Sequence, residues 1–249
     1  MKIVISSDWH LDAVTSGIPR FDEVARAVQQ TVEAAKRERA DLYLFLGDLC
    51  DPDASRAPRC VAYAIQVAAE LARAGIPSRW LVGNHDVIED GSATSTLSPL
   101  AAASHSIPMA VPMSLSPKTD RPVLVYERPM WESLCGIRLL ALPFVPRAAA
   151  YDPWDFIDPW QEETPDLIIG HLNVPGVIPG SESDEYARGR DSWFPVEKIR
   201  QRWPKVVLLN GHYHSPSIAP GDVLIPGSLA RLTHGEAHND PGYLLVEVG

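Results

Sequence analysis

Side chains that can bind metal ions stand directly after five short apolar segments of the chain. In chain order, the five groups are Asp8-Trp9-His10, Gly47-Asp48, Gly83-Asn84-His85-Asp86, Gly170-His171 and Gly211-His212-Tyr213-His214. Imidazole and carboxylate ligands together suit borderline divalent ions such as Mn, Fe or Zn. Two such ions held about 3.5–4 Å apart form a site that can hydrolyse phosphoesters. The residue types therefore point to metal-assisted phosphoester chemistry.

The spacing within these groups indicates which side chains can act together. Residues two apart on an extended chain point to the same side, so Asp8 can act with His10. The same reasoning joins His212 to His214. One carboxylate has two oxygens and can bridge two ions, and Asp48 is the natural candidate for that position.

Each group also has an ordinary interpretation. A Gly-Asp step at a strand end is usually a turn, and His-x-His on a strand more often lies at the surface.

Asn84 can ligate through its amide oxygen without adding charge. The glycine in front of four of the groups lets the backbone turn sharply off its strand. Because all five groups occur in order at strand ends, the sequence favours a dinuclear metal site over unrelated turns.

The first third of the chain alternates predicted strands and helices. The strands are the short apolar runs Lys2–Ser6, Asp41–Leu46 and Ser78–Val82, and the helices are Arg20–Arg39 and Pro58–Ala74. This rhythm implies parallel strands joined by right-handed crossovers. Ligands bind outside the carboxyl ends of such strands, so the five groups should converge on one site.

The rest of the chain predicts shorter strands and a second sheet. Ile107–Val111, Pro122–Tyr126 and Ile137–Pro143 suit an antiparallel continuation. Further predicted strands are Asp166–Ile169, Lys205–Leu209, Ser217–Ala219, Asp222–Ile225 and Tyr243–Val248, with a helix near Pro195–Arg202. We expect one compact α/β unit over residues 1–249, with two packed sheets, helices outside and no separate capping domain.

Composition narrows the class of protein. Of 249 residues, 45% are hydrophobic and 22% are charged, which excludes a largely disordered chain. The net charge of −10 argues against a broad nucleic-acid surface, but it leaves room for a local one. Neither a membrane helix nor a signal-peptide pattern is visible, and Cys50, Cys60 and Cys135 show no pairing. We therefore expect a cytoplasmic protein.

The five motifs and their order along the chain, from Ser6 to about Ser215, resemble those of the calcineurin-like metallophosphoesterase superfamily. The resemblance implies a four-layer α/β/β/α sandwich of two mixed sheets flanked by helices. It also implies two divalent metal ions, with Mn²⁺ the expected metal and Fe, Zn, Ni or Mg the alternatives. The first ion would take Asp8, His10, Asp48 and His214, and the second would take Asp48, Asn84, His171 and His212.

The resemblance also assigns catalytic and substrate-binding residues. His85 would lie over the phosphate with Asn84 and donate a proton or hydrogen bond, and Asp86 would orient it. The ordinary alternative for His85 is a turn residue beside the metals that does no chemistry.

Finer motifs are similar to SbcD-type DNA repair exonuclease subunits. These motifs are Ser6–Leu11, Gly170–Gly176 followed by Ser181-Glu182-Ser183, and Pro226–Leu232 followed by Gly235-Glu236. The similarity implies a DNA exonuclease or endonuclease, Arg231 as a substrate-binding residue and an SbcC-like ATPase partner. Asp51 stands where archaeal and eukaryotic nucleases of this type often have histidine.

Two other functions stay open at this point. One is a small-molecule phosphodiesterase or phosphatase acting on nucleotides or similar esters. The other is a metal-bound scaffold without catalysis, which the complete set of ligands disfavours. A homodimer is possible. The aromatic stretch Tyr151, Trp154, Phe156 and Trp160 could stack on a base, but packing of a loop onto the core is favoured.

Overall fold

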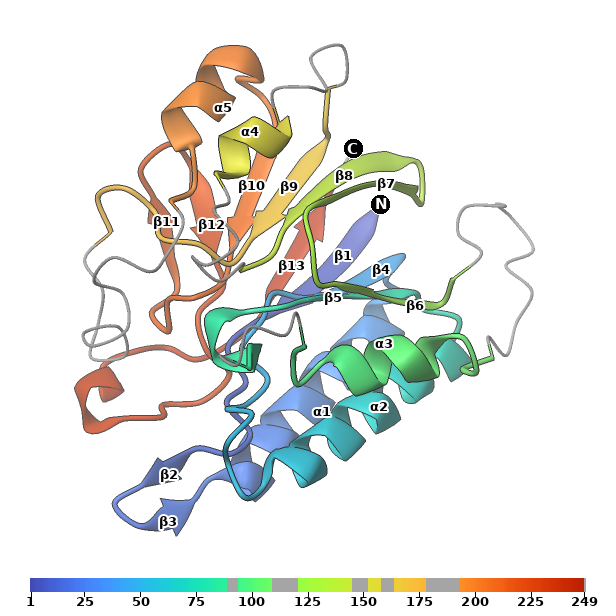
Figure 1. Cartoon of the computed structure of the whole chain (residues 1–249), viewed down its shortest axis with the longest axis vertical. Helices are drawn as coiled ribbons and strands as arrows, with labels where there is room; N and C mark the ends of the chain where they lie inside the picture. The colour runs from blue at the N-terminus through green and yellow to red at the C-terminus, as the bar shows by residue number, and fades with distance from the viewer. Residues whose placement is uncertain (89–93, 109–120, 145–151, 158–163, 178–192, 249) are drawn as a thin grey trace.

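The structure, a computed structural model, describes residues 1–88, 94–108, 121–144, 152–157, 164–177 and 193–248. Two mixed sheets pack face to face, and helices cover their outer faces (Figure 1). The expected α/β/β/α sandwich is therefore confirmed.

The first sheet carries three of the metal-binding groups at its strand ends. Its strand order is β13 (Leu244–Glu247), β1 (Lys2–Ser6), β4 (Leu42–Phe45), β5 (Ser78–Leu81) and β6 (Val123–Tyr126). All neighbouring pairs are parallel except β13 with β1. Its outer face is covered by α1 (Phe21–Glu38), α2 (Ala57–Arg73) and α3 (Ser98–Ser104), as Figure 1 shows.

The second sheet carries the remaining two groups. Its order is β11 (Ser217–Ala219), β12 (Val223–Ile225), β10 (Val207–Asn210), β9 (Leu167–Gly170), β8 (Ile137–Leu142) and β7 (Met130–Leu134). The four central strands are parallel, and the strand at each edge is antiparallel to its neighbour. Helices α4 (Pro153–Ile157) and α5 (Val196–Arg202) lie on its outer side (Figure 1).

Apolar side chains hold the layers together. The cluster between the two sheets contains Ile5 and Leu44 from the first sheet and Ile169 and Leu209 from the second, all fully buried. Separate clusters join each sheet to its outer helices. The central strands are thus buried on both faces. This packing holds each strand in place, and with it the polar group that follows the strand.

The structure corrects the predicted order of elements in several places. β6 is parallel to β5, where an antiparallel continuation was expected. Sequence reasoning missed β7, α3 and the small hairpin formed by β2 (Val14–Thr15) and β3 (Ile18–Pro19). Residues 107–108 are not a strand, and the remainder of the Ile107–Val111 prediction lies outside the described residues.

Other predictions for the second half have mixed outcomes. Trp154 and Phe156 pack against the core of the second sheet, which confirms loop packing for these two rings. Tyr151, Trp160 and the Ser181–Ser183 motif lie outside the described residues. None of the helices in the described ranges is both long enough and apolar enough to cross a membrane.

Candidate metal centre

The five groups of polar residues meet at one place. Their ligand atoms form two groups, and the atoms within each group lie within 4.8 Å of one another. The first group is Asp8, His10 and His214, and the second is Asp48, His171 and His212. The family resemblance implied two sets of ligands that contain these residues, with Asp48 shared and Asn84 added to the second set, and metal binding by them stays a prediction.

One carboxylate oxygen joins the two groups. Asp48 Oδ2 lies 3.5 Å from His10 Nε2 in the first group and 3.2 Å from His171 Nε2 in its own. An anionic oxygen between two sets of imidazoles is the arrangement expected of a bridging ligand.

Asn84 completes the second group. Its Oδ1 lies 3.0 Å from His171 Nε2 and 2.9 Å from His212 Nδ1. The amide oxygen is therefore directed at the same point as both imidazole nitrogens, and it adds a neutral donor to the set.

One buried oxygen of the first group has no hydrogen-bond partner within the described residues. Asp8 is fully buried, and its Oδ2 has no hydrogen-bond partner. Nearby, His10 Nε2 and His214 Nε2 face each other at 3.1 Å. A buried carboxylate oxygen without a partner is costly, and a divalent cation would satisfy it together with both nitrogens. The donor set therefore fits a metal ion.

Neighbouring acceptors fix the tautomer of three histidines. His171 Nδ1 donates to the Leu46 carbonyl at 2.6 Å, and His214 Nδ1 donates to Glu236 Oε1 at 3.0 Å. His212 is turned the other way, because its Nε2 donates to Asn173 Oδ1 at 3.2 Å. Each bond directs the opposite ring nitrogen toward the other atoms of its ligand group.

Sequence reasoning assigned no role to Glu236 or Asn173. Both occur in motifs that were noted, Gly235-Glu236 and the segment after His171, but their contacts depend on how distant loops meet. Glu236 is buried and also accepts the amide of Leu232 at 2.7 Å, so the carboxylate is held in place.

The backbone is strained at four of the ligands. Eight non-glycine residues in the described ranges have positive φ, and four of them are Asp8 (52°), His10 (41°), Asp48 (62°) and His212 (77°). Such angles cost free energy and persist only where the surroundings hold them. Their concentration here is an independent sign of a functional site.

Two glycines make room for the ligands in different ways. Gly47 has φ of +100°, and a side chain there would also approach His171 Nδ1. Gly83 has extended backbone (φ −97°), so the expected sharp turn is wrong at this position. A Cβ at Gly83 would instead overlap Asp48 Oδ1, so glycine is needed for close packing.

Asp86 does not contact the His85 ring, which corrects the expected orienting role. Its buried carboxylate accepts the backbone amides of Asp48 and Gly83, both at 2.9 Å, and the Thr96 hydroxyl at 2.7 Å. It thereby ties the loop after β4 to the loop after β5. Asp86 is a positioning residue for the metal-binding loops.

The carboxylate that contacts the His85 ring is that of Asp51, and the ring also packs edge-on against His10. Asp51 Oδ1 lies 3.0 Å from His85 Nδ1, and both side chains reach solvent. Burial opposes a charged imidazole, but the carboxylates of Asp48 and Asp51 outweigh it and raise the pKa of His85 to about 9. The His85 ring is therefore set up as a hydrogen-bond donor at the solvent side of the centre.

Burial and neighbouring charges set the ionisation of the ligands. Burial lowers the pKa of His212 to about 3 and the pKa of His10 well below its usual value, so both are neutral. Burial alone would raise the pKa of Asp48, but His171 and His85 hold it well below its usual range. Burial opposes a charged His171, but Asp48 outweighs it and raises the pKa of His171 to about 9, so a metal ion bound to His171 Nε2 would have to displace its proton.

The remaining predicted residues lie beside the centre. Trp9 is fully buried and packs against Phe45 and Trp80, with its Nε1 donating to Ser6 Oγ at 3.0 Å. Arg231 is not among the ligand groups, and its Nε donates to the Asn239 carbonyl at 2.8 Å.

The chain matches a protein family, and the curated proteins that it resembles include two nuclease subunits. The calcineurin-like phosphoesterase family matches residues 1–216. The SbcD subunit of the nuclease SbcCD from Staphylococcus saprophyticus is 26% identical over 100% of this chain and 66% of its own length. Exonuclease subunit 1 of Enterobacteria phage T4 is 30% identical over 99% of this chain and 65% of its own length.

The chain thus spans just under two thirds of the length of these two relatives. Among solved structures, the phosphoesterase Yfce from E. coli aligns with 99% of this chain and 88% of its own, at 15% identity and a TM-score of 0.42.

Proposed function

Because the chain belongs to the calcineurin-like phosphoesterase family, we propose that it is a phosphodiester hydrolase that uses two divalent metal ions and cleaves nucleic acid. One observation carries the hydrolase proposal: Asp48 Oδ2 lies within 3.5 Å of an imidazole nitrogen from each of the two ligand groups. The nucleic-acid proposal is supported by the two relatives, which are a nuclease subunit and an exonuclease subunit.

The finer proposals follow the same relatives. Both are described as subunits, which supports a partner subunit for this chain, and an SbcC-like ATPase is the partner we propose. DNA is the proposed nucleic acid, in a repair role. Mn²⁺ is the proposed metal because the donor set mixes imidazole nitrogen with carboxylate and amide oxygen.

The residues divide the work of hydrolysis between them. When bound, the two ions would activate a water nucleophile and neutralise charge on the phosphate oxygens. Asp48 joins the two ligand groups, Asn84 adds a neutral oxygen donor to the second group, and Asp8 supplies a second buried carboxylate. Burial of these groups keeps bulk water from competing for the ions.

His85 is the proposed proton donor to the leaving oxygen. Its backbone amide donates to Asp48 Oδ1 at 2.9 Å, which keeps the residue beside the bridging carboxylate. Its ring is held by Asp51 and is partly exposed, so a substrate arriving from solvent can reach it. A positioned donor of this kind contributes about 10²–10⁴-fold to turnover.

A comparison of three substrates tests the proposed function. With Mn²⁺ present, the protein should shorten labelled linear DNA and hydrolyse bis-p-nitrophenyl phosphate, while p-nitrophenyl phosphate reacts more slowly. EDTA should abolish all three activities. Turnover of the small esters without any change in DNA length would indicate a small-molecule phosphodiesterase instead. No turnover with any divalent metal would indicate a non-catalytic scaffold.

We expect His85→Ala to keep its metals but lose about 10²-fold or more of its turnover on DNA, because the leaving alkoxide is no longer protonated. The loss should be smaller on bis-p-nitrophenyl phosphate, whose aryl leaving group needs little help from an acid. Asp51→Asn should show an intermediate loss. Steady-state rates and metal analysis of the three proteins measure this, and equal losses on both substrates would argue against His85 as an acid.

A further inference from the structure

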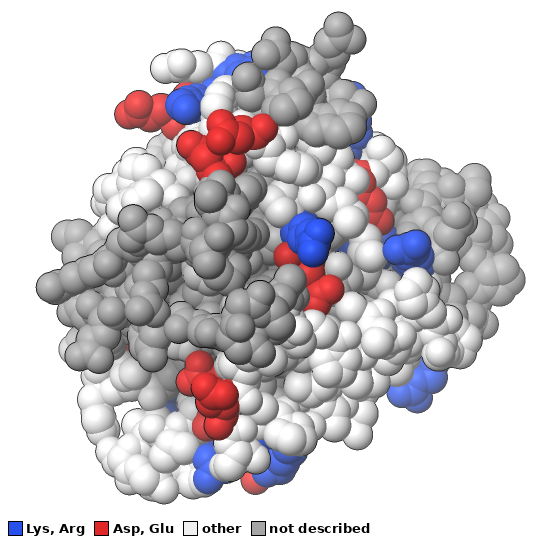
Figure 2. Space-filling view, viewed as in Figure 1, with Lys and Arg blue, Asp and Glu red and all other residues white. Residues whose placement is uncertain are grey.

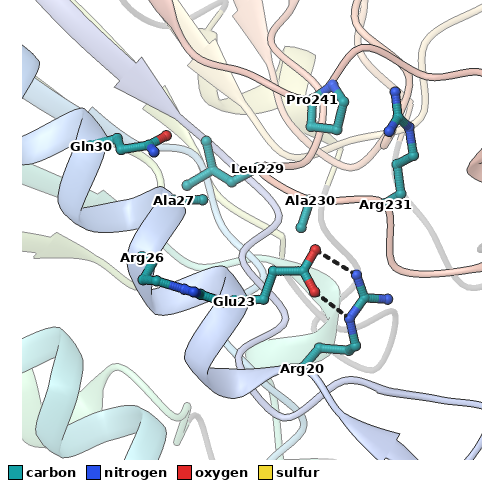
Figure 3. A pocket seen from close by; sticks show the side chains of 9 residues that line it. All are labelled: Arg20, Glu23, Arg26, Ala27, Gln30, Leu229, Ala230, Arg231 and Pro241. Atoms are coloured by element: carbon teal, nitrogen blue, oxygen red, sulfur yellow. Dashed lines mark hydrogen bonds and ion pairs between the residues drawn. The ribbon is translucent and has the colours of Figure 1, made fainter.

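A polar pocket lies between α1 and the segment before β13, outside the metal centre. Its volume is about 470 Å³. Helix α1 and the residue before it supply Arg20, Glu23, Arg26 and Gln30 on one wall, and Arg231 stands on the opposite wall (Figure 3). None of these side chains has a place in the proposed hydrolysis, although Arg231 was predicted to bind substrate.

The pocket has a charge opposite to that of the whole chain. Three arginines and one carboxylate line it, which gives an excess of two positive charges, whereas the chain carries −10. On the face shown in Figure 2, the described Lys and Arg side chains stand singly or in small groups beside Asp and Glu. A local concentration of positive charge in an acidic protein indicates an anionic ligand.

Two of the arginines keep donors available to a ligand. Each guanidinium nitrogen of Arg20 already forms a hydrogen bond. Two of these bonds, of 2.7 Å, go to Glu23, and one, of 2.8 Å, goes to Thr15. Arg26 donates only its Nε, to the carbonyl of Asp22 at 3.1 Å, within the described part of the chain. The forked terminal nitrogens of a guanidinium match phosphate geometry, so this free end suits a phosphate group.

Among the described residues, Arg231, like Arg26, forms its hydrogen bond through Nε, which leaves its terminal nitrogens facing a weak partner. Its Nε is used by the Asn239 carbonyl, and its nearest charged partner is the fully exposed Asp240, 4.0 Å from the guanidinium. At that distance and exposure the pair contributes little, so an incoming phosphate can compete with it. Figure 3 shows the Arg231 guanidinium on the wall facing α1.

The pocket is linked to the metal centre through one short segment. Arg231 precedes Leu232, whose amide donates to Glu236 Oε2 at 2.7 Å. The other oxygen of Glu236 accepts from the metal-ligand candidate His214 at 3.0 Å. The segment that carries Arg231 therefore also supports a metal-ligand candidate, which places the pocket and the centre on the same segment of chain.

We propose that this pocket binds a non-scissile phosphate of a nucleic-acid strand whose scissile phosphate lies at the metal centre. The proposal rests on the proposed nuclease function and adds to it a second phosphate site. A small diester cannot occupy both places, whereas a strand can. The pocket would thus favour polymeric substrates over small ones.

Arg26→Gln and Arg231→Gln test the pocket, with Arg73→Gln as the matched control. Arg73 is exposed on α2 and donates its Nε to the carbonyl four residues earlier, as Arg26 does on α1. The ratio of kcat/KM for a single-stranded oligonucleotide to kcat/KM for bis-p-nitrophenyl phosphate should fall about tenfold in each pocket variant. The slope of log KM against log salt should fall by about 0.7 for each arginine removed. Arg73→Gln should change neither quantity.

Binding measurements separate this proposal from the proposed function. Fluorescence anisotropy of a labelled oligonucleotide in EDTA should show weaker binding by both pocket variants, whether or not the protein cleaves DNA. Weaker binding without any hydrolysis would support the pocket and contradict the nuclease. An unchanged substrate ratio and unchanged binding in an active nuclease would overturn the pocket. Inorganic phosphate that raises the Tm of the wild type but not of Arg26→Gln, without an oligonucleotide effect, would assign the pocket to free phosphate and overturn the strand proposal.

Discussion

Asp48→Asn should remove both metal ions and reduce turnover about 10³-fold or more, because several kcal/mol of transition-state stabilisation depend on the ions. The variant can keep its amide oxygen at the Oδ1 position, which accepts the His85 amide. Its NH₂ group then replaces Oδ2, the atom that faces His10 and His171. A positively polarised donor between the two ligand groups repels cations from both sites.

Metal content and turnover measured on the same sample check this prediction. Asp53→Asn is the matched control, since Asp53 is exposed on the same loop and the substitution makes the same change in charge. Circular dichroism should show that both variants are folded. The bridging assignment is refuted if Asp48→Asn retains two ions per chain, while loss of only one ion would place Asp48 in a single site.

The convergence of the metal-ligand candidates could be predicted from sequence, because it depends only on the residue type and on the position at a strand end. A histidine or aspartate directly after a buried parallel strand is delivered to one edge of the sheet, whatever the details of the loops. Asp8, Asp48 and His212 were predicted on this basis, and the structure brings them into the two ligand groups. The strand directions alone suffice for that result.

The supporting contacts could not be predicted in the same way. Glu236 reaches His214 through a loop, and Asp51 replaces Asp86 at the His85 ring through another. These contacts depend on loop conformations that no periodic pattern in the sequence encodes. The positive φ values at Asp8 and Asp48 are of the same kind, since tertiary contacts impose them on residues that disfavour them.

A buried ion pair explains why β7 was missed. Glu132 lies in the middle of β7, and a charged residue there breaks the apolar pattern expected of a strand that packs on a core. In the structure it is the partner of Arg79 on β5, whose side chain is fully buried. Each charge is stabilised at its position by the other. Because the two residues are 53 positions apart in the sequence, their pairing could not be predicted from the local pattern.

This ion pair crosses from the first sheet to the second with close geometry. Arg79 donates its Nε to Glu132 Oε2 at 2.8 Å and a terminal nitrogen to Oε1 at 2.6 Å. Another terminal nitrogen donates to the Ser78 carbonyl at 3.0 Å. The Tyr126 hydroxyl donates to the same carboxylate, and burial raises the pKa of Tyr126 so that it stays protonated. The Glu132 carboxylate is therefore a direct counter-charge to the guanidinium.

Glu132→Gln should lower the free energy of unfolding by about 3–5 kcal/mol, because it removes the carboxylate that pairs with the buried guanidinium of Arg79. For a chain of this size the Tm should fall by roughly 10 °C. Arg79→Met alone should also destabilise the protein, since it leaves the Glu132 carboxylate with the Tyr126 hydroxyl but without its cationic partner.

The double variant Arg79→Met/Glu132→Leu provides the decisive comparison. Replacing both charges by apolar side chains of similar volume removes the uncompensated charge, so most of the stability lost in either single variant should return. Urea unfolding of the four proteins gives the coupling free energy. If the double variant is instead as unstable as the sum of the single variants, the two side chains act independently. The pair would then not be what holds these two edges of the sheets together.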